Sequence, residues 1–150
     1  MDAMRQLARQ GSVDPLVRSA AASIIRTAGP RDPASQIRRV RLFLKERVQY
    51  VADPVDVELV NRPRAMLQQV KAKGRAFGDC DDVATLAAAL GLAIGLPARF
   101  VAVGFDGLAG PFGHVYTELT GPGLKQWMRL DTTRPEVNAR QGSRVWRVMV

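Results

Sequence analysis

The chain has 150 residues, of which 47% are hydrophobic and 24% charged, a composition typical of a globular domain with a buried core. A single cysteine excludes an intrachain disulfide. With a single histidine beside it, the usual zinc sites are excluded too, and we expect neither a metal nor a cofactor. No apolar run approaches the roughly 20 residues that span a bilayer, and residues 1–10 lack the apolar core of a signal peptide. We therefore expect a cytoplasmic location and no membrane partner.

The net charge of +8 is unevenly distributed along the chain. Residues 1–75 hold 15 Lys and Arg against 7 Asp and Glu, whereas residues 76–150 hold 7 of each. A basic surface of this kind can bind nucleic acid electrostatically, which we keep as an alternative. No aromatic-interleaved basic patch accompanies the charge, so we favour solvated helix faces and do not expect nucleic acid as a partner.

The N-terminal half reads as a series of helices. Periodic apolar residues predict helices over residues 2–10, 15–28, 33–48 and 62–70. Asp14 and Asp32 are the expected caps of the second and third helices, and Gly11 is the expected end of the first. Residues 49–60 form either a short strand or an extended loop, and residues 71–78 form a basic connector.

The connector leads to Cys80, which precedes the apolar run from Val83 to Leu90. Ala and Leu favour a helix here, and it should be buried because it is apolar nearly all round. Asp79 is the expected N-cap, which places Cys80 in the first turn. The unpaired N–H groups of a helix N-terminus stabilise a thiolate and can hold the oxyanion that forms when a thiolate attacks a carbonyl.

The acidic neighbours of Cys80 act in the opposite direction. Asp79, Asp81 and Asp82 place negative charge beside the thiol, which raises its pKa. A reactive thiolate here needs a cationic partner. On its own, a single cysteine is more often a small buried apolar residue than a nucleophile.

The C-terminal half reads as a small sheet. Alternating residues predict strands over 98–105, 114–119 and 126–131, with an edge strand over 144–150. Residues 106–113 are glycine-rich and form a loop of the kind that borders a site. If Leu119 faces Gln126 across the loop of residues 120–125, His114 lies opposite Asp131, about 5 Å away.

A carboxylate behind a histidine fixes the tautomer of the imidazole and stabilises the imidazolium. His114 would then supply the cation that Cys80 needs. Each residue also has a structural interpretation, because a lone strand histidine is usually structural and Asp131 could end its strand through a local Asx turn. Because the three residues occur together in elements suited to catalysis, a catalytic role for Cys80, His114 and Asp131 is the better interpretation.

Several motifs in this order resemble the transglutaminase-like superfamily, the bacterial and phage type of papain-like cysteine enzyme. They are residues 48–53 (VQYVAD) with Glu58, residues 78–82 (GDCDD), residues 90–101 from Leu90-Gly91 to GLPARFV, residues 114–118 (HVYTE) and residues 127–133. The resemblance implies an α+β fold in which a central Cys-bearing helix, preceded by N-terminal helices, packs on a small antiparallel sheet. It places all 150 residues in one domain, with a helical extension over 1–30, a core over 35–133 and a tail or edge strand over 134–150.

The resemblance also implies a Cys–His–Asp triad of Cys80, His114 and Asp131. The expected reaction is acyl transfer from a peptide or isopeptide amide through a thioester, as a cysteine protease or amidase or as a transglutaminase. The alternative is a binding or structural module of the same fold without turnover, in a phage particle or a protein complex. The partner we expect is a protein or peptide substrate.

Other residues near these motifs are weaker candidates for the site. Gln49 and Tyr50 are candidates, by position only, for the side chain that would help the Cys80 N–H hold an oxyanion. Tyr116 stands where an aromatic residue is usual in the family, and core packing is an equal interpretation of it. Trp127 is expected to pack near the cleft.

Overall fold

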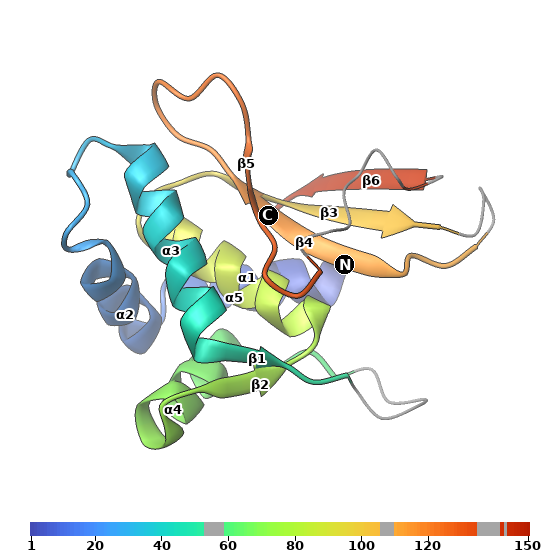
Figure 1. The fold of residues 1–150 in the computed structure, drawn as a ribbon, viewed down its shortest axis with the longest axis horizontal. Helices are drawn as coiled ribbons and strands as arrows, with labels where there is room; N and C mark the ends of the chain where they lie inside the picture. Colours follow the sequence, from blue (N-terminus) through green and yellow to red (C-terminus); the bar gives the residue numbers. More distant parts are fainter. Residues whose placement is uncertain (53–58, 106–109, 135–141, 143) are drawn as a thin grey trace.

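The structure, a computed structural model, describes residues 1–52, 59–105, 110–134, 142 and 144–150. In these residues the helices are α1 (Asp2–Ser12), α2 (Pro15–Ile25), α3 (Pro33–Arg47), α4 (Pro63–Lys73) and α5 (Cys80–Ala93). The strands are β1 (Val48–Tyr50), β2 (Ala76–Gly78), β3 (Ala98–Gly104), β4 (His114–Leu119), β5 (Met128–Leu130) and β6 (Arg144–Met149). The α+β class expected from the sequence is confirmed (Figure 1).

The predicted helix caps are present in the structure. The Asp14 carboxylate accepts a hydrogen bond from the Leu16 N–H at 2.8 Å, and that of Asp32 accepts one from Ser35 at 2.9 Å. The predicted end of the first helix at Gly11 is wrong. Gly11 lies inside α1, which ends at Ser12, and Pro63 packs against it so closely that a Cβ atom at Gly11 would lie 2.8 Å from the Pro63 ring.

Helix α5 is the centre of the fold. Every residue from Asp82 to Gly91 is buried, as the apolar run predicts. The helix contacts α1, α2, α3 and α4 as well as strands β3 and β4. In Figure 1 the four-stranded sheet lies on one side of α5, while α2, α3 and α4 gather on the other. The Thr117 hydroxyl donates to the Ala84 carbonyl at 2.7 Å and so joins β4 to α5.

The larger sheet has the order β5-β4-β3-β6, and all of its neighbouring strands are antiparallel. β6 forms one edge, as expected for the tail. β5 is shorter than the predicted strand over 126–131. The predicted loop over 106–113 and the tail over 134–150 fall partly outside the described residues, at 106–109, 135–141 and 143.

A second, two-stranded sheet pairs β1 with β2 in parallel, with α4 as the connection between them. The alternation predicted over 49–60 falls largely outside the described residues, at 53–58. β2 was not expected from the sequence, which predicted a connector over 71–78. This strand delivers the chain directly to Cys80. None of the helices in the described part of the chain is long and apolar enough to cross a membrane.

Candidate active site

A capping box fixes Cys80 in the first turn of α5. The Asp79 carboxylate accepts hydrogen bonds from the N–H groups of Asp81 at 3.0 Å and Asp82 at 3.2 Å. In return, the Asp82 carboxylate accepts one from the Asp79 N–H at 3.2 Å. Three N–H donors of the helix N-terminus are thereby satisfied, and the thiol is held on a rigid element.

Asp82 is one of the three acidic residues next to Cys80, and its contacts explain why a carboxylate is needed there. It is completely buried, and its two carboxylate oxygens accept hydrogen bonds from the Asn61 backbone at 2.6 Å and the Asn61 side chain at 2.8 Å. Gly78 packs against it so closely that a Cβ atom there would lie 2.6 Å from Asp82 Oδ2. Asp82 therefore joins the α5 N-terminus to the segment before α4, a structural role.

His114 and Asp131 are in contact. The His114 Nε2 atom lies 2.7 Å from Asp131 Oδ2, and both side chains are 1% exposed. The predicted register was wrong, because Thr117 pairs with Leu130 and the strands are shifted by two residues. Residues two apart on a strand share a face, so His114 still reaches Asp131 along the diagonal.

Asp131 is held by a full set of donors. Its Oδ1 atom accepts from the Thr133 N–H at 3.2 Å, the Thr133 hydroxyl at 3.1 Å and the Arg134 N–H at 3.1 Å, and its Oδ2 atom also accepts from the Arg129 guanidinium. Burial alone would raise the pKa of Asp131, but the hydrogen bonds from His114, Arg129 and Arg134 outweigh it and lower that pKa to about 2.

The ionised carboxylate determines which imidazole nitrogen carries a proton. A carboxylate can only accept, so His114 Nε2 is the donor to Asp131, and Nδ1 is the basic nitrogen of the neutral ring. The sequence did not identify Arg129 as part of this group. Its position two residues before Asp131, on the same face of the strand, was the available signal.

The thiol of Cys80 is protonated in this environment. Burial raises the pKa of Cys80 to about 12, and the charges of Asp81 and Asp79 add to the effect. The thiol donates to Asp81 Oδ1 at 3.6 Å, and among the described residues this carboxylate, not His114, is its side-chain partner. The effect of the acidic neighbours agrees with the sequence analysis.

Cys80 and His114 line a common cavity of about 540 Å³, at the junction of α5 and the start of β4. Its apolar wall includes Ala102, Phe112 and Trp146, and the last two rings stack with their centroids 6.0 Å apart. The sequence analysis missed this aromatic pair. Trp146 comes from the tail of the chain and reaches the cavity because β6 pairs with β3, opposite Ala102.

In a comparison with protein-family models, residues 18–132 match the transglutaminase-like superfamily. The chain belongs to this superfamily. The resemblance noted in the sequence is thereby confirmed, and it covers most of the chain. No curated protein sequence matches the chain.

Solved structures show the same fold. A candidate cysteine protease from Cytophaga hutchinsonii superposes with a TM-score of 0.59 at 20% identity, covering 79% of this chain and 37% of that protein. A candidate protease from Parabacteroides distasonis superposes with a TM-score of 0.68 at 15% identity, covering 98% of this chain and 28% of that protein. The chain therefore spans less than half the length of either protein.

Two further residues predicted for the superfamily site do not line the cavity. Gln49 in β1 accepts a hydrogen bond from Arg75 at 3.1 Å and lines a different cavity. Tyr50 pairs with Gly78, which is two residues before Cys80, but Tyr50 is 44% exposed and is not among the residues of the cavity wall. The structure thus gives neither residue a contact with the thiol.

The two aromatic candidates, Tyr116 in β4 and Trp127 just before β5, also lie outside the cavity wall. Tyr116 is buried, with its ring 6.0 Å from that of His114 and the Arg129 guanidinium 4.4 Å above it. Trp127 carries the Arg99 guanidinium 4.3 Å from its ring. Both make packing contacts, and Tyr116 supports the face of the sheet on which His114 and Asp131 meet.

The described residues include no group of side chains suited to bind a metal ion. In residues 1–52, 59–105, 110–134, 142 and 144–150, no three His, Cys, Asp or Glu side chains are grouped to hold a metal ion.

Proposed function

We propose that this chain catalyses acyl transfer from peptide or isopeptide amides through a thioester on Cys80, primarily as a cysteine protease or amidase. One observation carries the proposal. A histidine held by an ionised aspartate and a cysteine at a helix N-terminus line the same cavity. Membership of the transglutaminase-like superfamily supports the reaction class.

In the first half of the reaction, Cys80 Sγ attacks the amide carbonyl carbon while His114 Nδ1 takes the thiol proton. The electron pair of the carbonyl moves to its oxygen. Because the pKa of Cys80 is raised to about 12, the resting site holds a thiol, and proton removal has to accompany the attack. Asp131 stabilises the imidazolium that forms.

The oxyanion needs donors, and the N-terminus of α5 offers one. The capping box uses the N–H groups of Asp81 and Asp82, and Val83 donates to the Asp79 carbonyl at 3.1 Å. Within the described residues, the N–H of Cys80 is the one in this first turn for which no acceptor is recorded. We assign this N–H group to the oxyanion, with the helix dipole in support.

In the second half, the imidazolium returns its proton to the amine as the C–N bond breaks, which leaves a thioester on Cys80. His114 Nδ1 then deprotonates the acceptor, which attacks the thioester and releases the thiol. Water as the acceptor gives hydrolysis, and an amine gives transglutamination. The apolar wall with Phe112 and Trp146 favours an apolar side chain on the acyl donor.

A panel of peptide amides with a labelled amine, together with intact-mass detection of acylated Cys80, tests the proposal. We expect turnover by the wild type, none by Cys80→Ala or His114→Ala, and a thioester that hydroxylamine releases. A Gln49→Ala variant should retain turnover, because Gln49 lies at a different cavity. Turnover that survives Cys80→Ala would overturn the proposal.

A second candidate is a module of this fold that binds a partner without turnover, in a phage particle or a protein complex. The observation that favours it is the raised pKa of Cys80, whose thiol faces Asp81. It predicts a Cys80 that iodoacetamide alkylates no faster than glutathione at neutral pH, and a stoichiometric complex that survives Cys80→Ser. Faster alkylation that depends on His114 would decide in favour of the enzyme.

A further inference from the structure

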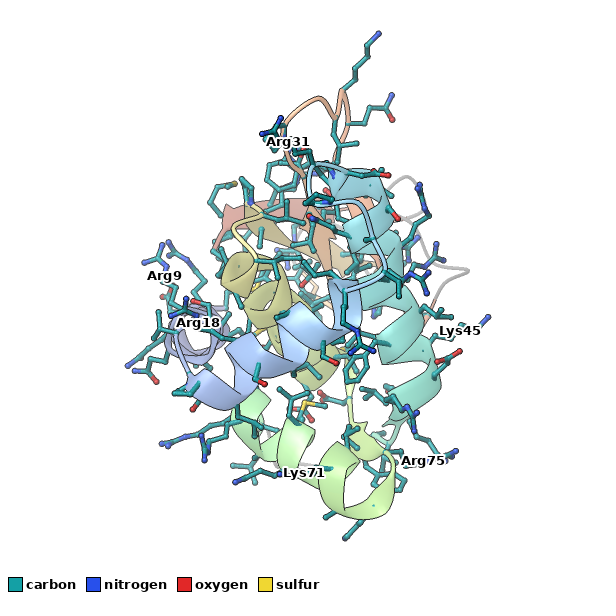
Figure 2. The ribbon with its side chains drawn as sticks, turned by 90° about the vertical axis from the view of Figure 1, so that its left-hand side faces the viewer. Arg9, Arg18, Arg31, Lys45, Lys71 and Arg75 are labelled. Carbon is teal, nitrogen blue, oxygen red and sulfur yellow. The ribbon has the colours of Figure 1, made fainter. Side chains whose placement is uncertain are left out.

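The basic character of the N-terminal half is concentrated on the outer surface of the helices. Figure 2 views this side and shows labelled cations from several elements around it, among them Arg9 and Arg18 on one flank and Lys45 and Arg75 on the other. Among the described residues, Asp14 pairs with Arg64 and Asp2 with Arg5, and no other carboxylate is recorded in an ion pair with a cation of α1 to α4. The positive field of this surface is therefore largely uncompensated.

Part of this charge converges on a second cavity, which we call the cationic cavity. It has a volume of about 310 Å³ and is lined by Lys45, Glu46, Arg47, Val48, Gln49 and Arg75. It lies where the end of α3 and strand β1 meet the chain before β2. The proposed acyl transfer makes no use of it.

The two guanidinium groups of the cationic cavity are anchored. Arg75 donates from Nη1 to the Gln49 side chain at 3.1 Å, and Arg47 donates from Nη1 to the Gly74 carbonyl at 3.3 Å. A guanidinium has five N–H donors, so most of those on each residue stay available for an anion. Partly ordered arginines lose less entropy when they bind a phosphate in the bidentate mode.

The cationic cavity continues into a line of cations on α3. Arg38, Arg41 and Lys45 are exposed and follow one another at helical spacing on the same side of α3. From Arg38 to Lys45 the helix rises by seven steps, or about 10 Å. One strand of duplex DNA carries a phosphate about every 3.4 Å along its axis, so this line matches roughly three of them.

We propose that the α3 line and the cationic cavity bind the phosphate backbone of a nucleic acid without reading its sequence. Repeated cations over several residues fit a polyanion better than a single phosphate. The sequence analysis favoured solvated helix faces because it found no base-stacking or groove-reading motif. Backbone binding does not need such a motif, and convergence of Lys45, Arg47 and Arg75 on one cavity appears only in the structure.

The test is fluorescence anisotropy of a labelled 20-base-pair DNA with the full chain between 50 and 200 mM salt. Five contacts, from Arg38, Arg41, Lys45, Arg47 and Arg75, predict a fall in affinity of about 500-fold over this range. Arg47→Gln with Arg75→Gln removes two contacts and should reduce the fall to about 40-fold. The double variant Arg38→Gln with Arg41→Gln also removes two contacts and should show the same reduced fall in affinity. It provides the test if the first double variant fails to fold.

The matched control is Arg9→Gln with Arg18→Gln, which removes the same charge from the other flank of the surface (Figure 2). It should keep the salt dependence of the wild type. No saturable binding at 50 mM salt, or an equal loss in the control, would overturn the proposal. Binding to vesicles rich in anionic lipid without binding to DNA would overturn it in favour of a membrane surface. These outcomes are independent of Cys80 and of the acyl-transfer assay.

Discussion

Asp131→Asn distinguishes the roles of the two carboxylate oxygens of Asp131. The amide can keep its oxygen on the side of Thr133 and Arg134, where Oδ1 accepts three hydrogen bonds. Its NH₂ group then faces the His114 ring and the Arg129 guanidinium, both of which donate to Oδ2 in the wild type. The Arg129 donor then opposes the amide donor, the His114 ring has to take its other tautomer to accept from the amide, and the charge that stabilises an imidazolium is gone.

The lowered pKa gives the size of the stability effect. A shift from the ordinary 3.8 to about 2 corresponds to about 2 kcal/mol of stabilisation at neutral pH. The Arg129 side chain is 25% exposed and its share is partly screened by solvent. We therefore expect Asp131→Asn to lower the free energy of unfolding by roughly 1 to 2 kcal/mol at pH 7.

The pH dependence follows from the direction of the shift. The folded-state pKa of Asp131 lies below its unfolded value, so its stabilisation is complete above about pH 4 and is lost as the pH falls toward 2. The difference between wild type and variant should shrink by about half between pH 7 and pH 3. Urea unfolding at several pH values measures it.

Asp2→Asn serves as the control for this series, because the Asp2 side chain is 98% exposed where it pairs with Arg5. The reasoning is refuted if Asp131→Asn unfolds at the same urea concentration as the wild type at pH 7. It is equally refuted if the stability difference stays constant down to pH 3.

Three other substitutions test separate parts of the structure. Asp81→Asn removes a charge and a hydrogen-bond acceptor that raise the pKa of Cys80. Iodoacetamide should therefore alkylate Cys80 roughly tenfold faster at pH 8. An unchanged rate would contradict the effect of Asp81 on this pKa. Gly91→Ala places a Cβ atom 2.4 Å from the buried Leu119 side chain, and thermal unfolding should show a loss of about 1 to 3 kcal/mol. Trp146→Ala removes part of the cavity wall, so a peptidyl fluoromethyl ketone with a benzyl side chain should label Cys80 roughly tenfold more slowly, while its glycine counterpart labels at the same rate.

Features with local causes could be predicted from the sequence. Asp79 caps α5 as expected, because an N-cap needs only the next three residues. β4 spans His114–Leu119 as predicted, because its apolar alternation is a local signal. The burial of α5 follows from its composition alone.

Features that depend on a residue far away along the chain could not be predicted from the sequence. α5 continues beyond the predicted apolar run to Ala93, and it contains Gly91 at a point where a Cβ atom would lie 2.4 Å from the Leu119 side chain. β2 is the short segment Ala76–Gly78 at the end of a basic connector, and it becomes a strand only beside β1. The position of Trp146 at the cavity depends on the pairing of β6 with β3, and strand order has no local signal.

The strand register explains why His114 and Asp131 meet although the predicted strand pairing was wrong. The pairing differs from the prediction by two residues, and Thr117 faces Leu130. An odd shift would have turned Asp131 to the opposite face of the sheet. An even shift kept it on the face of His114, where the imidazole reaches it diagonally at 2.7 Å. The face on which a residue lies is thus a firmer prediction than its exact partner.

The acidic residues around Cys80 set the requirements of the proposed reaction. Asp79 and Asp82 cap α5 and therefore cannot be lost without loosening the nucleophile. Burial raises the pKa of Cys80, the charges of Asp81 and Asp79 add to the effect, and the raised pKa opposes a resting thiolate. The proton has to leave during the attack, when charge develops on His114 and Asp131 can stabilise it. Acyl transfer in this chain should therefore depend more steeply on Asp131 than it would in a site whose thiolate and imidazolium exist before the substrate binds.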